Sequence, residues 1–415
     1  MTRLQALLLG CWVNLIVAAP LEAHFKIPAK PVRWLILETE HFRIHYPDGN
    51  YALGMAAARF SEAAYTRLRY TFQYEPDELI PVFLYPSRQD FAAGNILPFP
   101  IDEATGGFTD FFHRRVVVPF HGDYRALEHV LSHEIVHAFA LNLLEGNYGR
   151  YPLWLMEGMA ELLSPYSQDT LHEFMRPLVV AGELPPLVAL FSGRVPAYYH
   201  YKMGQSFLTF FTERYGTLRL AHLLLELKAG SSLSQAFFHL TGESISSLQK
   251  QYDLYLRDLY AIELAAWKRA DQAARVVKAK DRLHLSPAIS PDGRTMAYLT
   301  LIGVTPVLAI SDIPGPGREE RHVRRLRLKL RALHSGRYEE WQPLSTRISF
   351  RPDGQMLLLS GRSYGQQSLL FVDIRKKRIS ESRPVSLDAI HYPAYTPEGQ
   401  AVILTGVAAS RADLY

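Results

Sequence analysis

One segment of the chain carries apolar residues at every third or fourth position. From Arg125 to Glu145 it reads RALEHVLSHEIVHAFALNLLE, with no glycine or proline. This spacing matches the period of a helix that buries one face. Gly146 follows as a C-terminal stop signal. The pattern therefore predicts a long helix between Arg125 and Glu145.

Shorter apolar runs before this helix predict a sheet. Residues 34–45 read as one or two strands, residues 79–85 and 114–120 as further strands, and residues 51–69 as an alanine-rich amphipathic helix. Pro119 favours an edge position for the last strand, because proline cannot donate a ladder hydrogen bond. The free backbone groups of such a strand would pair with an extended peptide, although the pattern also suits an ordinary edge strand.

Farther along, the patterning changes from helical to strand-like. Residues 171–274 read as mostly helical and predict a second lobe, and the basic stretch 275–282 follows. Three similar units come next, each with a Pro-Asp-Gly or Pro-Glu-Gly turn between two short strands. The turns begin at Pro291, Pro352 and Pro397, at spacings of 61 and 45 residues. Repeats of about 40 to 50 residues built from short strands are typical of propeller blades.

The N-terminal segment, residues 1–23, predicts export. One early arginine precedes an apolar stretch and then small residues, the order of a secretory signal peptide with cleavage after Ala23 or Ala19. An uncleaved anchor is the alternative, because the apolar run approaches the about 17 to 20 residues that span a bilayer. Cys11 ends a stretch that resembles a bacterial lipidation box, but the apolar run before it is very short. It is the only cysteine, so the mature chain would lack disulfides, which suits a bacterial periplasmic or surface protein.

Composition and charge add limits on partners. The chain has 415 residues, of which 48% are hydrophobic and 21% charged, as in a globular protein of two or three domains. A net charge of +4 is too small to indicate a nucleic-acid partner. Residues 318–333 form a basic segment with strand periodicity. Contact with anionic lipid headgroups or an acidic partner is one interpretation, and a solvated blade face or an insertion between blades is the other.

Candidate chemistry lies within the predicted 125–145 helix, as the HExxH arrangement His133-Glu134-Ile135-Val136-His137. Two histidines four positions apart project from one helix face, close enough to share a metal ion. Glu134 is then placed to act on a metal-bound water. His129 lies one turn earlier, but three ligands from one helix fit tetrahedral zinc poorly. A buried or supporting position is the main interpretation of His129.

A metal held by two histidines needs a third protein ligand, with a fourth position left for water. The extended HExxHxxGxxH form is excluded, because Ala140 and Leu143 stand at its last two fixed positions. A glutamate from a following helix remains. The segment WLMEGMAE, residues 154–161, offers Glu157, twenty positions after the second histidine, and Glu161 one turn later. Two small residues in the same segment, Gly158 and Ala160, would let helices approach closely.

With both motifs in this order and at this spacing, the chain resembles the gluzincin zinc metallopeptidases of the peptidase MA-like group. Their pattern is HExxH followed, about twenty residues later, by a glutamate within W-L-x-E-G-x-A-E. The resemblance implies that one Zn²⁺ is bound by His133, His137 and Glu157, with Glu134 as general base. It also implies that Glu161 orients the first histidine, a common need of metal-bound imidazole. A zincin-like α+β domain, with a mixed sheet lobe and a helical lobe, is the fold that it implies.

A further donor to the oxyanion of the reaction is expected, usually a tyrosine or histidine from later in the chain. The cluster Tyr198-Tyr199-His200-Tyr201, just before an apparent helix, is the candidate region. Tyr201 is the first choice and His200 the second. Aromatic packing at a helix start is the alternative interpretation of each.

The three later units resemble TolB-like, or WD40-like, beta-propeller repeats, whose core is S-P-D-G followed by an apolar strand. The third unit departs from this core, with Glu398 in place of aspartate. Three blades do not close a propeller, which needs about four to eight, so we expect a fragment or a longer natural protein. The expected organisation is a signal peptide (1–23), a metallopeptidase domain (24–274), a linker (275–283) and an incomplete all-β propeller (284–415).

These patterns together predict an exported bacterial zinc metallopeptidase, in the periplasm or at the cell surface. It would hydrolyse peptide bonds, as an endopeptidase, in a peptide or protein substrate, and the propeller would position substrate or a protein partner. The alternative is a catalytically silent envelope protein, for binding or assembly, that holds polypeptide without cutting it.

Overall fold

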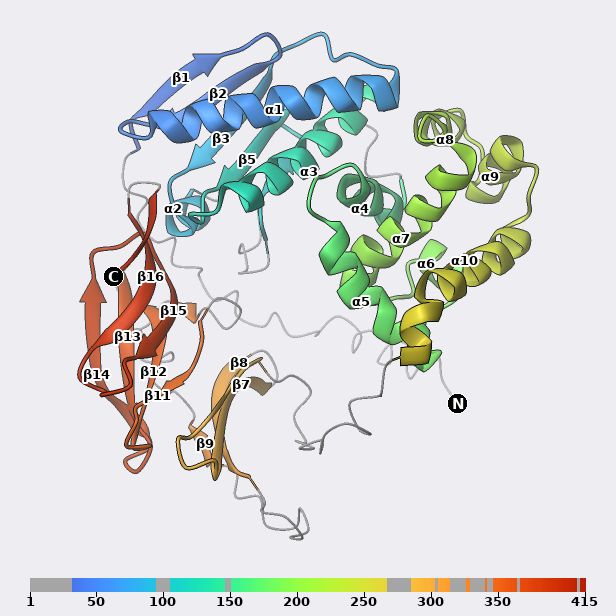
Figure 1. Ribbon diagram of the computed structural model, residues 1–415. Coiled ribbons are helices and arrows are strands. Elements are labelled where there is room, and N and C mark those ends of the chain that lie inside the picture. The colour runs from blue at the N-terminus through green and yellow to red at the C-terminus, as the bar shows by residue number, and fades with distance from the viewer. Residues whose placement is uncertain are drawn as a thin grey trace, which may run out of the picture.

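The computed structural model describes most of the chain outside its N-terminal segment. The described residues are 32–94, 105–145, 151–266, 285–302, 305–313, 326–328, 340–341, 346–363, 366–408 and 411–415. They form a mixed α/β, multidomain structure with several sheets, none of which closes on itself within the described ranges (Figure 1). The predicted signal peptide and the linker at 275–283 lie outside the described residues, as does most of the basic segment 318–333.

The first sheet has five strands in the order β1-β2-β3-β5-β4. Parallel pairing joins β2 to β3 and β3 to β5, whereas β1 and β4 run antiparallel to their neighbours. The mixed sheet agrees with the strands expected at 34–45, 79–85 and 114–120. The strands are β1 (Trp34–Glu38), β2 (Phe42–Pro47), β3 (Ile80–Tyr85), β4 (Phe108–Asp110) and β5 (Arg115–Pro119).

The expectation that the 114–120 strand lies at an edge was wrong. β5 is an interior strand, because β4 pairs with it from Phe108 opposite Val117 to Asp110 opposite Arg115. Pro119 is compatible with this position, because the pairing of β5 with β4 stops at Val117 and Pro119 pairs only with Tyr85 of β3. The edge strand on this side of the sheet is β4, whose three residues are too few to produce a readable alternation.

Two long helices cover one face of this sheet, α1 (Tyr51–Phe72) and α3 (Tyr124–Leu143) (Figure 1). Both helices were predicted, α1 with three more residues at its end. Alternate residues of the strands, such as Ile44 and Val82, are fully buried beneath them. The N-terminus of α3 is capped by Asp123, whose side chain accepts from the backbone N–H of Arg125 at 2.8 Å. A short helix, α2 (Arg88–Ala93), was not predicted.

The next part of the chain is helical, as the sequence predicts, up to Ala266 at the end of the described range. Its core gathers large aromatic rings, among them the fully buried Phe207, Phe237 and Tyr252. The Phe207 ring contacts the other two at centroid distances of 5.6 and 5.5 Å. The helices are α4 (Leu153–Leu162), α5 (Gln168–Ala181), α6 (Leu187–Phe191), α7 (Ala197–Tyr215), α8 (Arg219–Lys228), α9 (Leu233–Thr241) and α10 (Ile245–Ala266).

Helices α4 and α7 approach each other closely because each has a glycine at the crossing. A Cβ atom added at Gly158 would lie 2.5 Å from the carbonyl carbon of Gly204. One added at Gly204 would lie 2.5 Å from the carbonyl oxygen of Trp154. The expectation that Gly158 permits a close helix approach is confirmed, and the partner is α7, the helix that begins at the aromatic cluster.

Gly158→Ala is expected to destabilise the protein by about 1–3 kcal/mol, the usual cost of overpacking. Alanine has the better helix propensity, by about 1 kcal/mol, but the new methyl group would meet backbone within 2.8 Å rather than a yielding side chain. Chemical denaturation with a chelator present measures this change without a contribution from metal binding. A variant as stable as the parent would contradict the close crossing.

Three separate antiparallel sheets follow, one for each of the predicted repeat units (Figure 1). The first contains β6 to β9, the second contains β10 to β14, and the third contains β15 to β17. Their bounds are β6 (Leu285–Ile289), β7 (Thr295–Ile302), β8 (Thr305–Asp312), β9 (Leu326–Leu328), β10 (Glu340–Trp341), β11 (Ser349–Phe350), β12 (Met356–Ser363), β13 (Gln366–Asp373), β14 (Arg378–Val385), β15 (Ala389–Tyr395), β16 (Val402–Ala408) and β17 (Arg411–Leu414).

The repeated turns have one conformation in all three sheets. Gly293, Gly354 and Gly399 have φ values of 70°, 70° and 73°, in the left-handed region that glycine adopts without strain. In each turn the glycine N–H donates to the carbonyl three residues earlier, at 2.8 Å. The Pro-Asp/Glu-Gly signature therefore marks a real hairpin in each unit, and Glu398 at the middle position of the third does not alter it.

Candidate metal centre

Two helices bring together the three residues predicted to bind metal. His133 and His137 lie one turn apart on α3, and Glu157 lies on α4. Glu157 Oε2 is 3.3 Å from His133 Nε2 and 3.4 Å from His137 Nε2. One ligand atom from each of the three lies within 4.8 Å of the others. The arrangement is that of a candidate His-His-Glu metal site.

The separations of these atoms suit zinc. Metal–ligand bonds of about 2.0–2.2 Å at tetrahedral angles place neighbouring ligand atoms about 3.3–3.6 Å apart. The two measured separations, 3.3 and 3.4 Å, lie within this range. Two imidazoles and one carboxylate also form the donor set of hydrolytic zinc sites, which keep a fourth position open. The residues present therefore fit a zinc ion.

The charge balance of the site favours an ionised Glu157. Burial by itself would raise the pKa of Glu157, but the nearby charges and hydrogen bonds of His137 and His133 outweigh it and hold the pKa well below its usual range. For His133 burial acts in the opposite direction and by itself would lower the pKa. The hydrogen bond to Glu157 and the charges of the surrounding carboxylates outweigh burial, so the pKa of His133 is raised. A cation shared by these three groups would offset the negative charge of the carboxylates around them.

Glu134 contacts the edge strand through its side chain. Thr109, on β4, has its Oγ1 atom 2.8 Å from Glu134 Oε2 and 2.9 Å from the Glu134 backbone oxygen. Both residues are buried: 6% of the surface of Glu134 and 8% of that of Thr109 is exposed. Thr109 thus fixes the predicted base against the sheet. Sequence reasoning missed it, because its strand is too short to be read and the only signal is the pair Gly106-Gly107 before it.

Glu161 lies on the side of the first histidine away from Glu157. Its Oε1 atom is 3.6 Å from His133 Nδ1, the ring nitrogen that does not face Glu157. His129 is placed on the same side, with Nε2 4.0 Å from Glu161 Oε1 and Nδ1 2.8 Å from the backbone oxygen of Pro165. His129 therefore faces Glu161 and a backbone carbonyl.

Tyr201 reaches the site from the second turn of α7. Its ring lies nearly parallel to that of His133, with centroids 6.2 Å apart and an angle of 12° between the planes. Burial, the negative charges of Glu157 and Glu134 and a hydrogen bond to Glu157 all raise the pKa of the Tyr201 hydroxyl. The phenol therefore stays protonated and can donate a hydrogen bond at every pH at which the protein would work.

His200 has a different environment from Tyr201. It is buried, with 7% of its surface exposed, and burial lowers the pKa of its imidazole. Its Nδ1 atom has no hydrogen-bond partner among the described residues. Of the two candidates for the oxyanion donor, Tyr201 is the one that contacts both the first histidine and Glu157.

A buried lysine, absent from the sequence-based site, completes the surroundings of Glu161. Lys202 Nζ donates to Glu161 Oε2 at 2.6 Å and to Thr170 Oγ1 at 2.8 Å. The only signal in the sequence is one cation at the end of an otherwise aromatic segment, YYHYK. Its partners come from α4 and α5, so this contact depends on how three helices pack.

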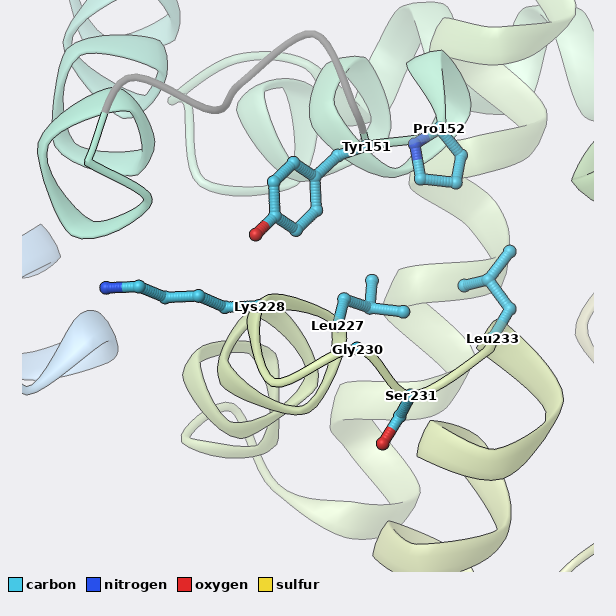
Figure 2. A pocket seen from close by; sticks show the side chains of 7 residues that line it. All are labelled: Tyr151, Pro152, Leu227, Lys228, Gly230, Ser231 and Leu233. Carbon is cyan, nitrogen blue, oxygen red and sulfur yellow. The ribbon is translucent and has the colours of Figure 1, made fainter.

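A pocket of about 420 Å³ lies apart from this site, beside the turn between α8 and α9 (Figure 2). Tyr151, Leu227 and Lys228 are among its lining residues. Lys228 Nζ donates to the backbone oxygen of Leu143 at 3.0 Å and to Glu145 at 2.8 Å. It therefore binds the C-terminal end of α3, where a cation stabilises the helix. None of the candidate metal ligands lines this pocket, and we assign it no chemistry.

Comparisons with known proteins identify no family. A scan against protein-family models finds no match, and no curated protein matches the chain. Solved structures similar to it include TolB from Acinetobacter baumannii (22% identity over 34% of this chain and 30% of that one, TM-score 0.25). A second is hydrazine synthase from Kuenenia stuttgartiensis (24% identity over 28% of this chain and 30% of that one, TM-score 0.21). A third is the beta-propeller domain of Myceliophteria thermophila Cps50 (Swd1) (19% identity over 28% of this chain and 32% of that one, TM-score 0.20). The chain spans about a third of the length of each.

Proposed function

We propose that this chain is an exported zinc metallopeptidase of the gluzincin kind. The observation that carries the proposal is the His133, His137 and Glu157 cluster, with separations of 3.3 and 3.4 Å that suit one zinc ion. Glu134, next to the first ligand in sequence and held by Thr109, supports a hydrolytic rather than a structural metal site. Structural zinc sites use four protein ligands, and this cluster supplies three.

The catalytic step follows from the chemistry of the groups. Zinc, when bound, lowers the pKa of a coordinated water from about 15.7 to about 7 and polarises a carbonyl oxygen. Glu134 accepts one proton of the attacking water, and the oxygen bonds to the peptide carbonyl carbon. Glu134 then delivers that proton to the departing amine nitrogen as the C–N bond breaks. Thr109 holds the Glu134 carboxylate in position throughout.

Substrate binding is proposed at the edge of the first sheet. β4 is the edge strand beside the site, and its Thr109 touches Glu134. An extended peptide added to this edge would receive backbone hydrogen bonds, and its carbonyl would lie near the base. Tyr201 would donate a hydrogen bond to the oxygen on which negative charge develops.

The remaining parts of the proposal rest on the sequence. The N-terminal signal features support export to the periplasm or the cell surface of a bacterium. Among the described residues, no helix has the length and apolar character needed to cross a membrane. The three hairpin sheets are proposed to be blades of a TolB-like propeller that positions a polypeptide substrate or partner.

Metal analysis together with a peptide-cleavage assay tests the proposal directly. Purified protein is expected to contain about one equivalent of zinc, as one three-ligand site requires. It should cleave an unstructured polypeptide, lose activity with a chelator and regain it with zinc. Protein that binds polypeptide but neither holds zinc nor cleaves would instead support the catalytically silent binding protein.

Tyr201→Phe is expected to lower kcat by about 100-fold to 1,000-fold, the range for loss of one oxyanion donor. KM should change little, because the hydroxyl acts on charge that develops in the transition state. Steady-state kinetics on a fluorogenic peptide measures both constants. Tyr199→Phe is the control, since it removes a hydroxyl two residues away. Equal kcat for Tyr201→Phe and the parent would exclude Tyr201 as the donor.

A further inference from the structure

Lys202 is a fully enclosed cation. Only 4% of its surface is exposed, and its ammonium group donates to Glu161 Oε2 at 2.6 Å and to Thr170 Oγ1 at 2.8 Å. These contacts join the second turn of α7 to α4 and α5. An interior charge of this kind is seldom found without a specific partner, and here the partner is one carboxylate.

The two oxygens of Glu161 have different neighbours. Oε2 accepts from Lys202 at 2.6 Å, whereas Oε1 lies 3.6 Å from His133 Nδ1 and 4.0 Å from His129 Nε2. With Oε2 occupied by Lys202, Oε1 is the oxygen directed toward the imidazoles. The lysine thereby decides which way the carboxylate faces.

Stability alone is a poor explanation of this ion pair. Removing two charges from water costs about as much as their attraction returns, and apolar replacements of such pairs are often neutral or stabilising. A metal-bound imidazole, by contrast, needs a fixed acceptor at its other nitrogen to hold its tautomer and ring plane. Glu161 Oε1, 3.6 Å from His133 Nδ1, is the carboxylate oxygen placed to be that acceptor, and it can serve only while its own orientation is held.

We infer that Lys202 is a positioning residue that holds Glu161 against His133 and so raises the affinity of the site for zinc. This inference rests on the proposed zinc site but concerns a residue outside the ligand set. Lys202 also follows Tyr201 directly in sequence. Its attachment to α4 and α5 therefore fixes the helix turn from which Tyr201 reaches the first histidine.

Zinc affinity, measured by competition with a chromophoric chelator, tests the inference without any use of catalytic activity. Lys202→Met is expected to weaken zinc binding by about 10-fold to 100-fold, the range for groups that orient a metal ligand. Glu161→Gln should weaken it by a similar factor. The double variant Glu161→Gln/Lys202→Met should be no weaker than Glu161→Gln alone, because the lysine acts through the carboxylate.

Two control variants separate this effect from general destabilisation. Lys228→Met removes a lysine that bonds to the end of α3, and Ser206→Ala removes a hydrogen bond of 2.8 Å to Tyr252 within the same helix α7. Both should retain the zinc affinity of the parent. The double variant also restores charge balance in the interior, so it remains informative if Lys202→Met alone folds poorly.

Three results would overturn the inference and leave the zinc site itself standing. One is an unchanged affinity in folded Lys202→Met. Another is an additive loss in the double variant, which would mean that lysine and carboxylate act independently. The third is a loss of zinc affinity in Ser206→Ala as large as that in Lys202→Met. A parent protein without zinc affinity would instead overturn the proposed function.

Discussion

Glu134→Gln is expected to reduce peptide hydrolysis by between about 100-fold and 10,000-fold, the usual contribution of a positioned base, and to leave zinc bound. Glutamine keeps the shape of the side chain and its contact with Thr109, which lies 2.8 Å from Glu134 Oε2. It cannot accept the proton of the attacking water. Because Glu134 is not among the three clustered ligands, the metal content should not fall.

Steady-state kinetics and metal analysis on the same preparation measure both parts of this result. Glu128→Gln is a matched control: it lies on the same helix, undergoes the same chemical change and bonds to Tyr166 at 2.9 Å. It should retain the activity of the parent. Full activity in folded, zinc-loaded Glu134→Gln would show that another group is the base, and the reaction would need a new assignment.

Glu157→Ala is expected to abolish tight zinc binding. The variant leaves only His133 and His137, and two protein ligands cannot hold a hydrolytic zinc site. Glu161→Ala removes a group that orients His133 without binding the metal, so its loss of affinity should be confined to about 10-fold to 100-fold. A larger loss of zinc affinity in Glu157→Ala than in Glu161→Ala would identify Glu157 as the metal ligand and Glu161 as the residue that orients His133.

Chelator competition across the two variants and the parent provides the measurement. Glu183→Ala serves as the control, since this glutamate is exposed in the segment that follows α5. It should bind zinc as the parent does. Equal and negligible losses in Glu157→Ala and Glu161→Ala would mean that the third ligand lies elsewhere.

Several elements could be predicted from residue pattern because they depend on neighbours in the chain. Helix α3 follows from an uninterrupted 3.6-residue period, and the three hairpin turns follow from glycines that adopt positive φ. His133 and His137 share a helix face for the same reason, since the spacing of four residues is itself the geometry. The contact of these histidines with Glu157 joins two helices, so residue pattern alone does not predict it. It was expected only because the spacing resembles that of a known family.

Other features could not be predicted, because they arise only when distant segments pack. The strand at 114–120 looked like an edge from its proline, yet the three residues of β4 pair with its first part. Thr109 reaches Glu134 across 25 positions of sequence, and Lys202 reaches Glu161 across 41. No periodicity links residues so far apart.

The chain therefore carries the local parts of the candidate site in its residue order: a helix with two histidines, a second helix with two glutamates, and an aromatic start to a third. Packing decided how these parts are supported. The glycines at 158 and 204 set the close approach of α4 to α7, which brings Tyr201 beside His133 and Lys202 beside Glu161. Helix geometry depends on residues within one or two turns, whereas burial and ion pairing depend on whichever segments meet in space.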